Sequence, residues 1–291
     1  MTTSRPSNST LSAPELPTPT PPLSSSLPPP VPGLSSADSA PAVASSSVAP
    51  APLSKTKRDR QAHNEVFNRG NYHGYYGFRT DCVPDARLQL LEPALFEGRN
   101  VLDLGCNAGK LSIETLVHLG ARRVVGLDID PVLIAQSEAA RVAAGLADDA
   151  RLSFVEADFL PPGFFDSAPA RALLPPGERF ETILLLSITK WLHLHAGDDG
   201  LLVLFHALAG LLPPGGALVV EPQEWANYKS AARKAKDLRP VFAAIKMRPD
   251  FEPYLGQEGG ECGEGAGLVL ERKIERDEGG FSRPLCVWRK E

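Results

Sequence analysis

The sequence predicts an α/β fold with a doubly wound, mostly parallel sheet. Short apolar segments alternate with helix-like segments between residues 100 and 221. A glycine turn follows the first apolar segment, and an acidic residue ends the second. Alternating strands and helices form parallel sheets, which bind ligands beyond the carboxyl ends of their strands. We therefore look for a functional site at those ends.

Residues 1–54 contain little besides Pro, Ser, Ala and Thr. Their apolar side chains are too few to offset the entropy of ordering, so we predict a disordered tail before one domain at residues 55–291. The tail is either unselected or a docking peptide for a proline-binding domain. The basic cluster Lys55–Arg60 is a nuclear import signal, an RNA-contacting arm or a solvated helix start. We expect a nuclear location, with the cytoplasm as a second one.

An aromatic segment follows between Phe67 and Arg79, where rings and arginines alternate with glycines. Such a segment suits neither a helix nor a core. Its rings can stack on bases and its guanidinium groups can bind phosphates, as in a lid over a nucleotide site. For Tyr76 and Phe78 the alternative is packing of a helix before the sheet. For Tyr72 and Arg79 we favour a role in ligand binding.

The remaining elements alternate along the chain. We expect Pro161–Gly177, which is rich in proline, to be a mobile surface loop. We expect helices at Asp85–Leu91, Pro131–Ala144 and Asp199–Leu211, and strands at Val101–Leu104, Ala121–Asp130, Leu152–Val155, Phe180–Leu186 and Gly216–Glu221.

The glycine turn and the next strand together indicate a nucleoside site. Gly105 can adopt backbone conformations closed to other residues, and Gly109 lets the helix approach the strand. Asp103 lies at the end of the first strand, and Asp128 lies where a carboxylate would bind both ribose hydroxyls. The turn lacks the denser glycine pattern that cradles a pyrophosphate, which favours a ligand without phosphates.

A second candidate region follows the fourth predicted strand, where Lys190 and His193 flank Trp191. A cation here would suit an acidic acceptor such as phosphate; the alternative is a solvated lysine at a helix start. His193 and His195 lie two residues apart, so we expect a structural role and no metal. The four cysteines are dispersed, which fits neither a zinc site nor a disulfide framework.

Several motifs resemble the bicoid-interacting family of RNA methyltransferases, and most closely the branch that contains the 7SK small nuclear RNA methylphosphate capping enzyme. The resemblance runs from about Asn64 to the C-terminus. His195 departs from it, because the family usually has Asn there. The matching stretches are Asn71–Arg79, Asp103–Gly109, Gly126–Asp130, Ser187–Leu194, Gly197–Gly200, Glu221–Trp225 and Gly280–Pro284.

The resemblance implies a seven-stranded, Rossmann-like class I methyltransferase with S-adenosyl-L-methionine as cofactor. It also implies methyl transfer to the 5′ terminal (γ-)phosphate of a small non-coding RNA, which is thereby capped. We expect Lys190, Tyr76 and Arg79 to act on the RNA end. We expect the cofactor to be bound by Tyr72, Arg79, Asp103, Gly105, Asn107, Gly109, Asp128, Ile129, Asp158 and Ser187.

The net charge of −5 requires any RNA-binding surface to be local. Between Lys229 and Arg248, seven cations face only Asp237, which indicates RNA contact or a solvated face. We expect a monomer without membrane spans, with ribonucleoprotein partners as an option. Three alternatives stay open: a methyltransferase acting on another acceptor, an RNA chaperone with little turnover, and a nicotinamide oxidoreductase.

Overall fold

The computed structural model describes residues 68–73, 75, 84–256, 263–275 and 283–291, all within one compact unit. The predictions for the tail (residues 1–54), for Lys55–Arg60 and for Tyr76, Phe78 and Arg79 fall outside these residues. So does part of Gly280–Pro284.

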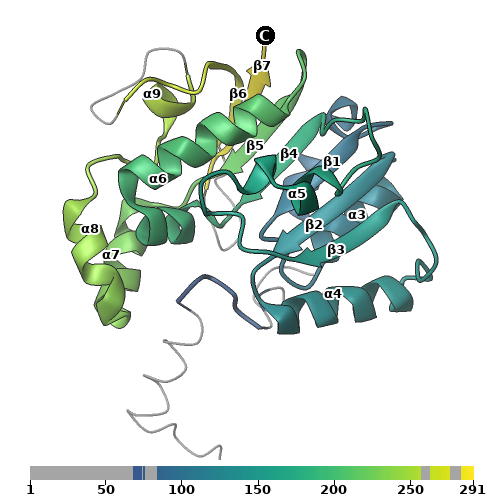
Figure 1. Ribbon diagram of the computed structural model, residues 1–291, viewed down its shortest axis with the longest axis horizontal. Coiled ribbons are helices and arrows are strands. Elements are labelled where there is room, and N and C mark those ends of the chain that lie inside the picture. Colours follow the sequence, from purple (N-terminus) through teal and green to yellow (C-terminus); the bar gives the residue numbers. More distant parts are fainter. Residues whose placement is uncertain (1–67, 74, 76–83, 257–262, 276–282) are drawn as a thin grey trace, which may run out of the picture. The chain divides into compact units, whose positions relative to one another are not determined.

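A seven-stranded sheet forms the centre of the described fold (Figure 1). Its order is β3-β2-β1-β4-β5-β7-β6. The first five strands in this order are parallel, and β7 pairs antiparallel with both of its neighbours, β5 and β6. The predicted doubly wound, mostly parallel sheet is confirmed. The strands are β1 (Asn100–Leu104), β2 (Arg123–Asp128), β3 (Leu152–Glu156), β4 (Thr182–Leu186), β5 (Ala217–Glu221), β6 (Leu268–Ile274) and β7 (Leu285–Lys290).

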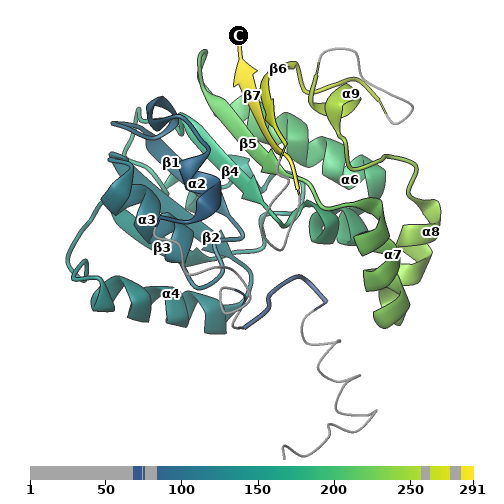
Figure 2. The ribbon, with the colours of Figure 1, turned by 180° about the vertical axis from the view of Figure 1, so that it is seen from behind.

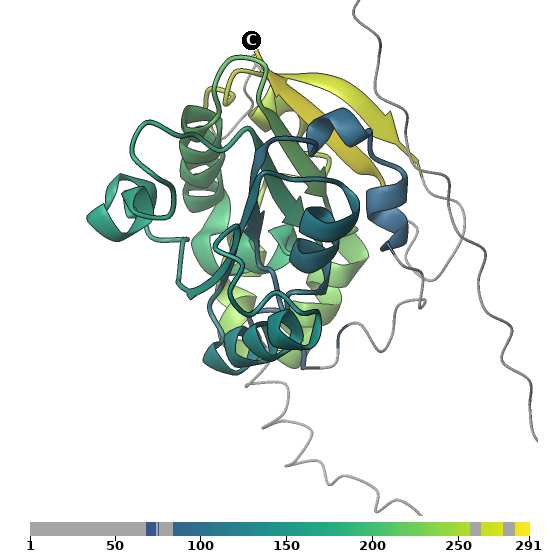
Figure 3. The same cartoon turned by 90° about the vertical axis from the view of Figure 1, so that its right-hand side faces the viewer.

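Two hydrophobic cores cover the two faces of the sheet, because successive strand residues point to opposite sides. On β1, Leu102 and Leu104 belong to one core and Val101 to the other. Figures 2 and 3 show the helices in layers on both sides of the sheet. One face packs against α6 (Thr189–Leu211) and α9 (Glu252–Leu255), and the other against α2 (Ala86–Gln89), η2 (Pro93–Leu95), α3 (Lys110–His118) and α4 (Pro131–Ala143).

Helix α6 begins ten residues earlier than the sequence predicts. Gly197 interrupts it with φ 68° and ψ −173°, so a first helical segment of Thr189 onward precedes the kink. The sequence pattern shows only the part after Gly197, because glycine commonly ends a helix. As a consequence, Lys190 and His193 lie on a helix that begins at the carboxyl end of β4.

The proline-rich segment Pro161–Gly177 is not a plain loop. It contains η3 (Phe164–Asp166) and α5 (Ala168–Arg171), and Ser167 caps α5 by accepting the backbone N–H of Ala170 at 3.3 Å. Ala170 and Leu174 are buried, and Leu174 joins the core on the α6 face. The prediction that this whole segment is a loop was therefore wrong, because proline is well tolerated in the first turn of a helix; its mobility stays a prediction.

A smaller group of elements packs beside the start of α6. It comprises α7 (Trp225–Lys234), η4 (Lys236–Leu238) and α8 (Arg239–Ala244). Tyr228, Leu238 and Ile245 form a third core with Trp191 and Leu194 of α6. This packing places the basic run predicted between Lys229 and Arg248 next to the carboxyl ends of β4 and β5.

Candidate functional site

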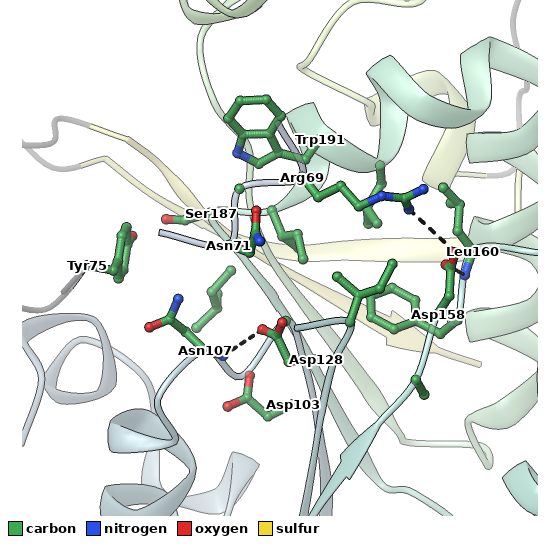
Figure 4. Close-up of a pocket in the computed structure, with 18 of the residues that line it drawn as sticks. Arg69, Asn71, Tyr75, Asp103, Asn107, Asp128, Asp158, Leu160, Ser187 and Trp191 are labelled. Atoms are coloured by element: carbon green, nitrogen blue, oxygen red, sulfur yellow. Dashed lines mark hydrogen bonds and ion pairs between the residues drawn. The ribbon is translucent and has the colours of Figure 1, made fainter. Parts of the chain in front are cut away.

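A first cavity lies at the carboxyl ends of β1, β2 and β4 (Figure 4). Figure 4 shows Asp103, Asn107 and Asp128 on one side, with Arg69 and Asn71 opposite them. The glycine turn and the acidic end of β2 together predict a nucleoside site, and both line this cavity. Of the residues predicted to bind the cofactor, the lining includes Asp103, Gly105, Asn107, Asp128, Ile129, Asp158 and Ser187.

Asp128 connects the glycine turn to the end of β2. Its carboxylate accepts the backbone N–H of Asn107 at 2.9 Å and that of Asp130 at 3.0 Å. Burial raises the pKa of Asp128, while these backbone hydrogen bonds oppose the rise. A carboxylate has about four lone-pair positions, so acceptor capacity remains for a ligand with hydroxyl groups.

Asn107 offers a second acceptor to the same cavity. It has φ 52°, and its side chain is 8% exposed. Its Nδ2 donates to the carbonyl of Tyr72 at 3.3 Å, whereas its Oδ1 is buried without a hydrogen-bond partner among the described residues. Since a buried acceptor without a partner is costly, this oxygen indicates a place for a ligand donor.

Asp103 is 4% exposed and accepts the hydroxyl of Ser112 at 2.5 Å. Burial raises its pKa to about 6, against the lowering effects of the Ser112 hydroxyl and the nearby Arg87. A cationic ligand group would stabilise the charged form of this carboxylate. Asp103 and Asn107 together thus suit an ammonium group.

No sequence motif pointed to Arg87, which lines the first cavity. Its side chain is 2% exposed and binds the carboxylate of Asp85 through two nitrogens, each at 2.9 Å. A third nitrogen reaches Glu221, at the end of β5, at 3.4 Å. Because buried charges must be paired, this network ties α2 to the sheet below the cavity. The sequence around a single Arg in a short amphipathic helix does not predict that its side chain is buried.

A segment that we call the strap (residues 68–73) closes the other side of the first cavity. Arg69 reaches Asp158 at 3.4 Å, and Asn71 and His73 both reach the Asp130 carboxylate, at 2.7 and 3.0 Å. Gly70 has φ 84°, and a Cβ added there would lie 2.1 Å from the Trp191 ring. The strap therefore depends on glycine for its close approach to α6.

These features fit S-adenosylmethionine. The carboxylate of Asp128 matches ribose hydroxyls, and the acceptors Asp103 and Asn107 match an ammonium group. Ile129, Phe159 and Leu160 provide an apolar slot for a base, with Asp158 beside it. Gly105 has φ 75°, and a Cβ there would lie 2.2 Å from Ile188. The turn can thus pack closely against Ile188, another residue that lines the cavity, because residue 105 is glycine.

A second cavity adjoins the first one. The two share Gly70, Tyr75, Ser187 and Trp191, which form the wall between them. Three cations line the second cavity: Lys190, Lys234 and Arg283. No Asp, Glu or His side chain is among the described residues that line it. The first cavity is thus acidic at the strand ends, whereas the second one is basic.

The three cations are close enough to affect one another. The pKa of Lys190 is lowered to about 8, first by burial and then by the charges of Arg283 and Lys234. Its ammonium group lies 4.1 Å from the centre of the Trp191 ring. An anion in the second cavity would relieve the repulsion among these charges.

Two predicted cofactor residues lie elsewhere. Gly109 precedes α3 with φ 74° and does not line the first cavity; a Cβ there would lie 2.7 Å from Phe154 and from Ser137. Tyr72 lines the second cavity instead, 39% exposed, with its ring edge-on to Trp191 at 6.0 Å. Ser187, with φ 60°, lines both cavities.

The two histidines before the kink of α6 make structural contacts. His193 is fully buried, with its Nε2 2.7 Å from Asp198 and its Nδ1 3.3 Å from the Tyr228 hydroxyl. The Nε2 of His195 lies 3.1 Å from the carbonyl of Asn68 and so helps to hold the strap. Across the described parts of the chain, no cluster of His, Cys, Asp or Glu could hold a metal ion. No helix among those parts is long and apolar enough to span a bilayer.

The basic run divides into two groups. Arg239 donates to the carbonyls of Ala232 and Arg233 at the end of α7, and Arg248 lies 4.3 Å from the centre of the Trp225 ring. These two arginines hold the packing of α7 and α8. Lys234 lines the second cavity, and the other four cations of the run lie on the surface away from it: Lys229, Arg233, Lys236 and Lys246. All seven cations of the run are exposed.

Comparison with known families gives two matches. Residues 180–290 match the bicoid-interacting protein 3 family, and residues 85–158 match the family of the ribosomal protein L11 methyltransferase. The first match covers β4 to β7 and therefore most of the second cavity. The second match covers the glycine turn and Asp128.

Three relatives are similar to the chain over much of its length. The U6 snRNA methylphosphate capping enzyme Amus of Drosophila melanogaster is 35% identical and aligns over 77% of this chain and 75% of its own. The RNA 5′-monophosphate methyltransferase of Bos taurus is 33% identical, over 65% and 70%. The 7SK snRNA methylphosphate capping enzyme of Homo sapiens is 30% identical over 83% of this chain, which spans 41% of the human protein.

Proposed function

The chain belongs to the bicoid-interacting protein 3 family and is an S-adenosylmethionine-dependent methyltransferase, and we propose that its acceptor is the 5′ terminal phosphate of a small RNA. The observation that carries this proposal is the second cavity. It adjoins the first one across a shared wall, and its charged side chains are all cations among the described lining residues. A phosphate is the RNA group that matches such a lining.

The lining also distinguishes phosphate from other acceptors. Methyl transfer to a neutral amine or hydroxyl calls for a group that removes a proton. The described lining of the second cavity offers no carboxylate or imidazole for that task. A phosphate oxygen is already anionic at neutral pH, so it needs orientation and not deprotonation.

When bound, S-adenosylmethionine supplies an electrophilic methyl group on its sulfonium. Asp128 binds the ribose, and Asp103 with Asn107 binds the amino acid part. Lys190, Lys234 and Arg283 bind the phosphate oxygens and hold the terminal one toward the wall formed by Gly70, Tyr75, Ser187 and Trp191. Alignment of this kind contributes on the order of 7 to 11 kcal/mol to lowering a barrier.

We further propose that a triphosphate end is preferred over a monophosphate end. Three cations in one cavity match the higher charge of a triphosphate, and their mutual repulsion is relieved most by the more charged ligand. The relatives at 30% and 35% identity are named for methylphosphate caps, and the one at 33% for a 5′-monophosphate. The exposed cations of the basic run outside the second cavity would bind the following nucleotides through their phosphates; they are Lys229, Arg233, Lys236 and Lys246.

The test is transfer of a labelled methyl group to one RNA prepared with three different 5′ ends. A triphosphate end should accept label fastest, a monophosphate end more slowly, and a hydroxyl end not at all. Label on the hydroxyl-ended RNA at a comparable rate would place the acceptor on a base or ribose and would refute the proposal. A monomer and association with ribonucleoprotein partners are also proposed, and sedimentation of the protein with and without RNA tests the former.

A further inference from the structure

Helix α6 begins without a cap of its own. The residue before its first turn is Ile188, whose side chain makes no hydrogen bond to the helix. The first backbone N–H groups of any helix lack partners within the helix and must find them elsewhere. The partners of these N–H groups matter in α6, because Lys190 is its second residue and lines the second cavity.

Gln223, which lies just after β5, supplies the missing cap. Its Oε1 accepts the backbone N–H of Lys190 at 2.9 Å and the hydroxyl of Thr189 at 2.8 Å. Its Nε2 donates to the carbonyl of Ser187. One amide side chain thus fixes the three residues Ser187, Thr189 and Lys190, which follow β4, although it lies beyond the end of β5.

The cap is rigid because its residues are buried and hydrogen-bonded to one another. Gln223 is 2% exposed and Thr189 is fully buried. The buried Tyr228 hydroxyl, which is close to Thr189, lies 3.3 Å from Nδ1 of His193. Neither Gln223 nor Thr189 can rotate without leaving a buried polar group unsatisfied.

We propose that Gln223 is a positioning residue for methyl transfer: by capping α6 from the adjacent strand, it places Lys190 at the phosphate and Ser187 in the wall between the two cavities. This inference rests on the proposed function. Gln223 acts through Lys190 and Ser187, and the cofactor contacts of Asp103 and Asp128 do not depend on it.

The experiment uses the full chain and Gln223→Met, which keeps a similar volume and removes all three hydrogen bonds. The control is Thr182→Val, which removes a buried hydrogen bond at the opposite end of β4, from Thr182 to the Leu95 carbonyl. Gln223→Met should lower kcat/KM for triphosphate-ended RNA by about ten- to hundredfold, because small misplacements of reacting groups have effects of this size. Cofactor affinity by calorimetry should be unchanged, and the control should match the parent protein in kcat/KM.

A double-mutant cycle separates positioning from general structural damage. If Gln223 acts through Lys190, Gln223→Met should lower kcat/KM by less than about twofold when Lys190 is already alanine, because coupled residues are not additive. An undiminished loss in the Lys190→Ala background would overturn the proposal. So would kcat/KM equal to that of the parent protein in the single variant.

Two further measurements keep the proposal testable. If circular dichroism shows that Gln223→Met is misfolded, Thr189→Val takes its place; it removes one of the three hydrogen bonds, and the same non-additivity with Lys190→Ala is expected. Hydrogen exchange at the Lys190 amide should be faster in Gln223→Met, which removes the acceptor of this amide, and unchanged exchange in that variant would refute the cap itself. If the parent protein does not methylate 5′-phosphorylated RNA, the proposed function fails, while the exchange measurement still decides whether Gln223 is the cap.

Discussion

The carboxylate of Asp128 accepts the backbone N–H of Asn107 at 2.9 Å, which joins the end of β2 to the glycine turn after β1. The two residues lie 21 positions apart in the chain. This bond holds the ribose-binding carboxylate close to Asn107, whose Oδ1 has no hydrogen-bond partner in the part of the chain that the structure describes. The two parts of the cofactor site therefore form one rigid unit.

Asp128→Ala should weaken S-adenosylmethionine binding by about 1 to 3 kcal/mol, because it removes hydrogen bonds to the ribose and frees the Asn107 turn. Calorimetric titration with the cofactor measures this. The matched control is Asp149→Ala, which removes an aspartate that pairs with Arg151 on the surface. Equal cofactor affinity for Asp128→Ala and the parent protein would contradict the placement of the cofactor in the first cavity.

Gly70→Ala should displace the strap, since the added Cβ would lie 2.1 Å from the Trp191 ring and φ at this position is 84°. The strap lines both cavities, so cofactor affinity and methyl transfer should both fall, while the melting temperature should stay near that of the parent protein. Gly98→Ala is the control for backbone strain alone, because Gly98 also has positive φ but nothing lies within 4 Å of its added Cβ. Similar losses in the two variants would mean that contact with Trp191 is unimportant.

The fold and the first cavity were largely predictable, and the reason is that both depend on local patterns. Short apolar segments predict the strands, and a glycine turn (Gly105) and an acidic residue (Asp128) predict where the first two strands end. The seven-strand sheet and its mostly parallel order were confirmed. The roles assigned to individual site residues stay predictions, and those for Tyr76 and Arg79 concern residues outside the described structure.

The second cavity was harder to predict because its residues are far apart in the sequence. Lys190, Lys234 and Arg283 come from α6, the end of α7 and the approach to β7. Only the packing of α7 against α6 and the antiparallel pairing of β7 with β5 bring them together. Gln223 likewise has no local signal as a helix cap, since caps are normally sought at the residue before the helix.

RNA binding should depend on pH through Lys190. Its pKa of about 8 lies below the ordinary value of 10.5, so the side chain loses its charge as the pH rises through about 8. Affinity for triphosphate-ended RNA should therefore fall above that pH. A bound phosphate raises the pKa of Lys190, so the fall should occur at a somewhat higher pH than in the free protein. Lys190→Arg, which stays charged, should show a flatter profile from pH 7 to pH 10. Parallel profiles for the two proteins would argue against Lys190 as a phosphate ligand.

The same profile makes a prediction about stability. The unfolded chain binds more protons than the folded chain at Lys190 between its lowered and its ordinary pKa, so this residue should make the free energy of unfolding rise with pH across that window. Denaturant titrations of the parent protein and Lys190→Met should differ in slope with pH accordingly. No difference would mean that Lys190 is solvated as in an ordinary surface lysine.

Salt should weaken RNA binding but leave cofactor binding nearly constant, because RNA association releases counterions while cofactor recognition rests on buried hydrogen bonds. Lys234→Gln should reduce the slope of log affinity against log salt by about one phosphate contact. Lys273→Gln, which removes an exposed lysine paired with Glu275 on β6, is the control and should leave the slope unchanged. An equal slope for Lys234→Gln would exclude Lys234 from the RNA contact.

The central claim, methyl transfer to a 5′ terminal phosphate, is tested most directly by mass spectrometry of the 5′ end. Triphosphate-ended RNA is incubated with the protein and S-adenosylmethionine, digested with a nuclease, and its 5′ fragment is analysed. We predict one added methyl group on the terminal phosphate, lost from the nucleotide when the triphosphate is removed enzymatically. A methyl group that stays on the base or ribose after that removal would contradict the claim.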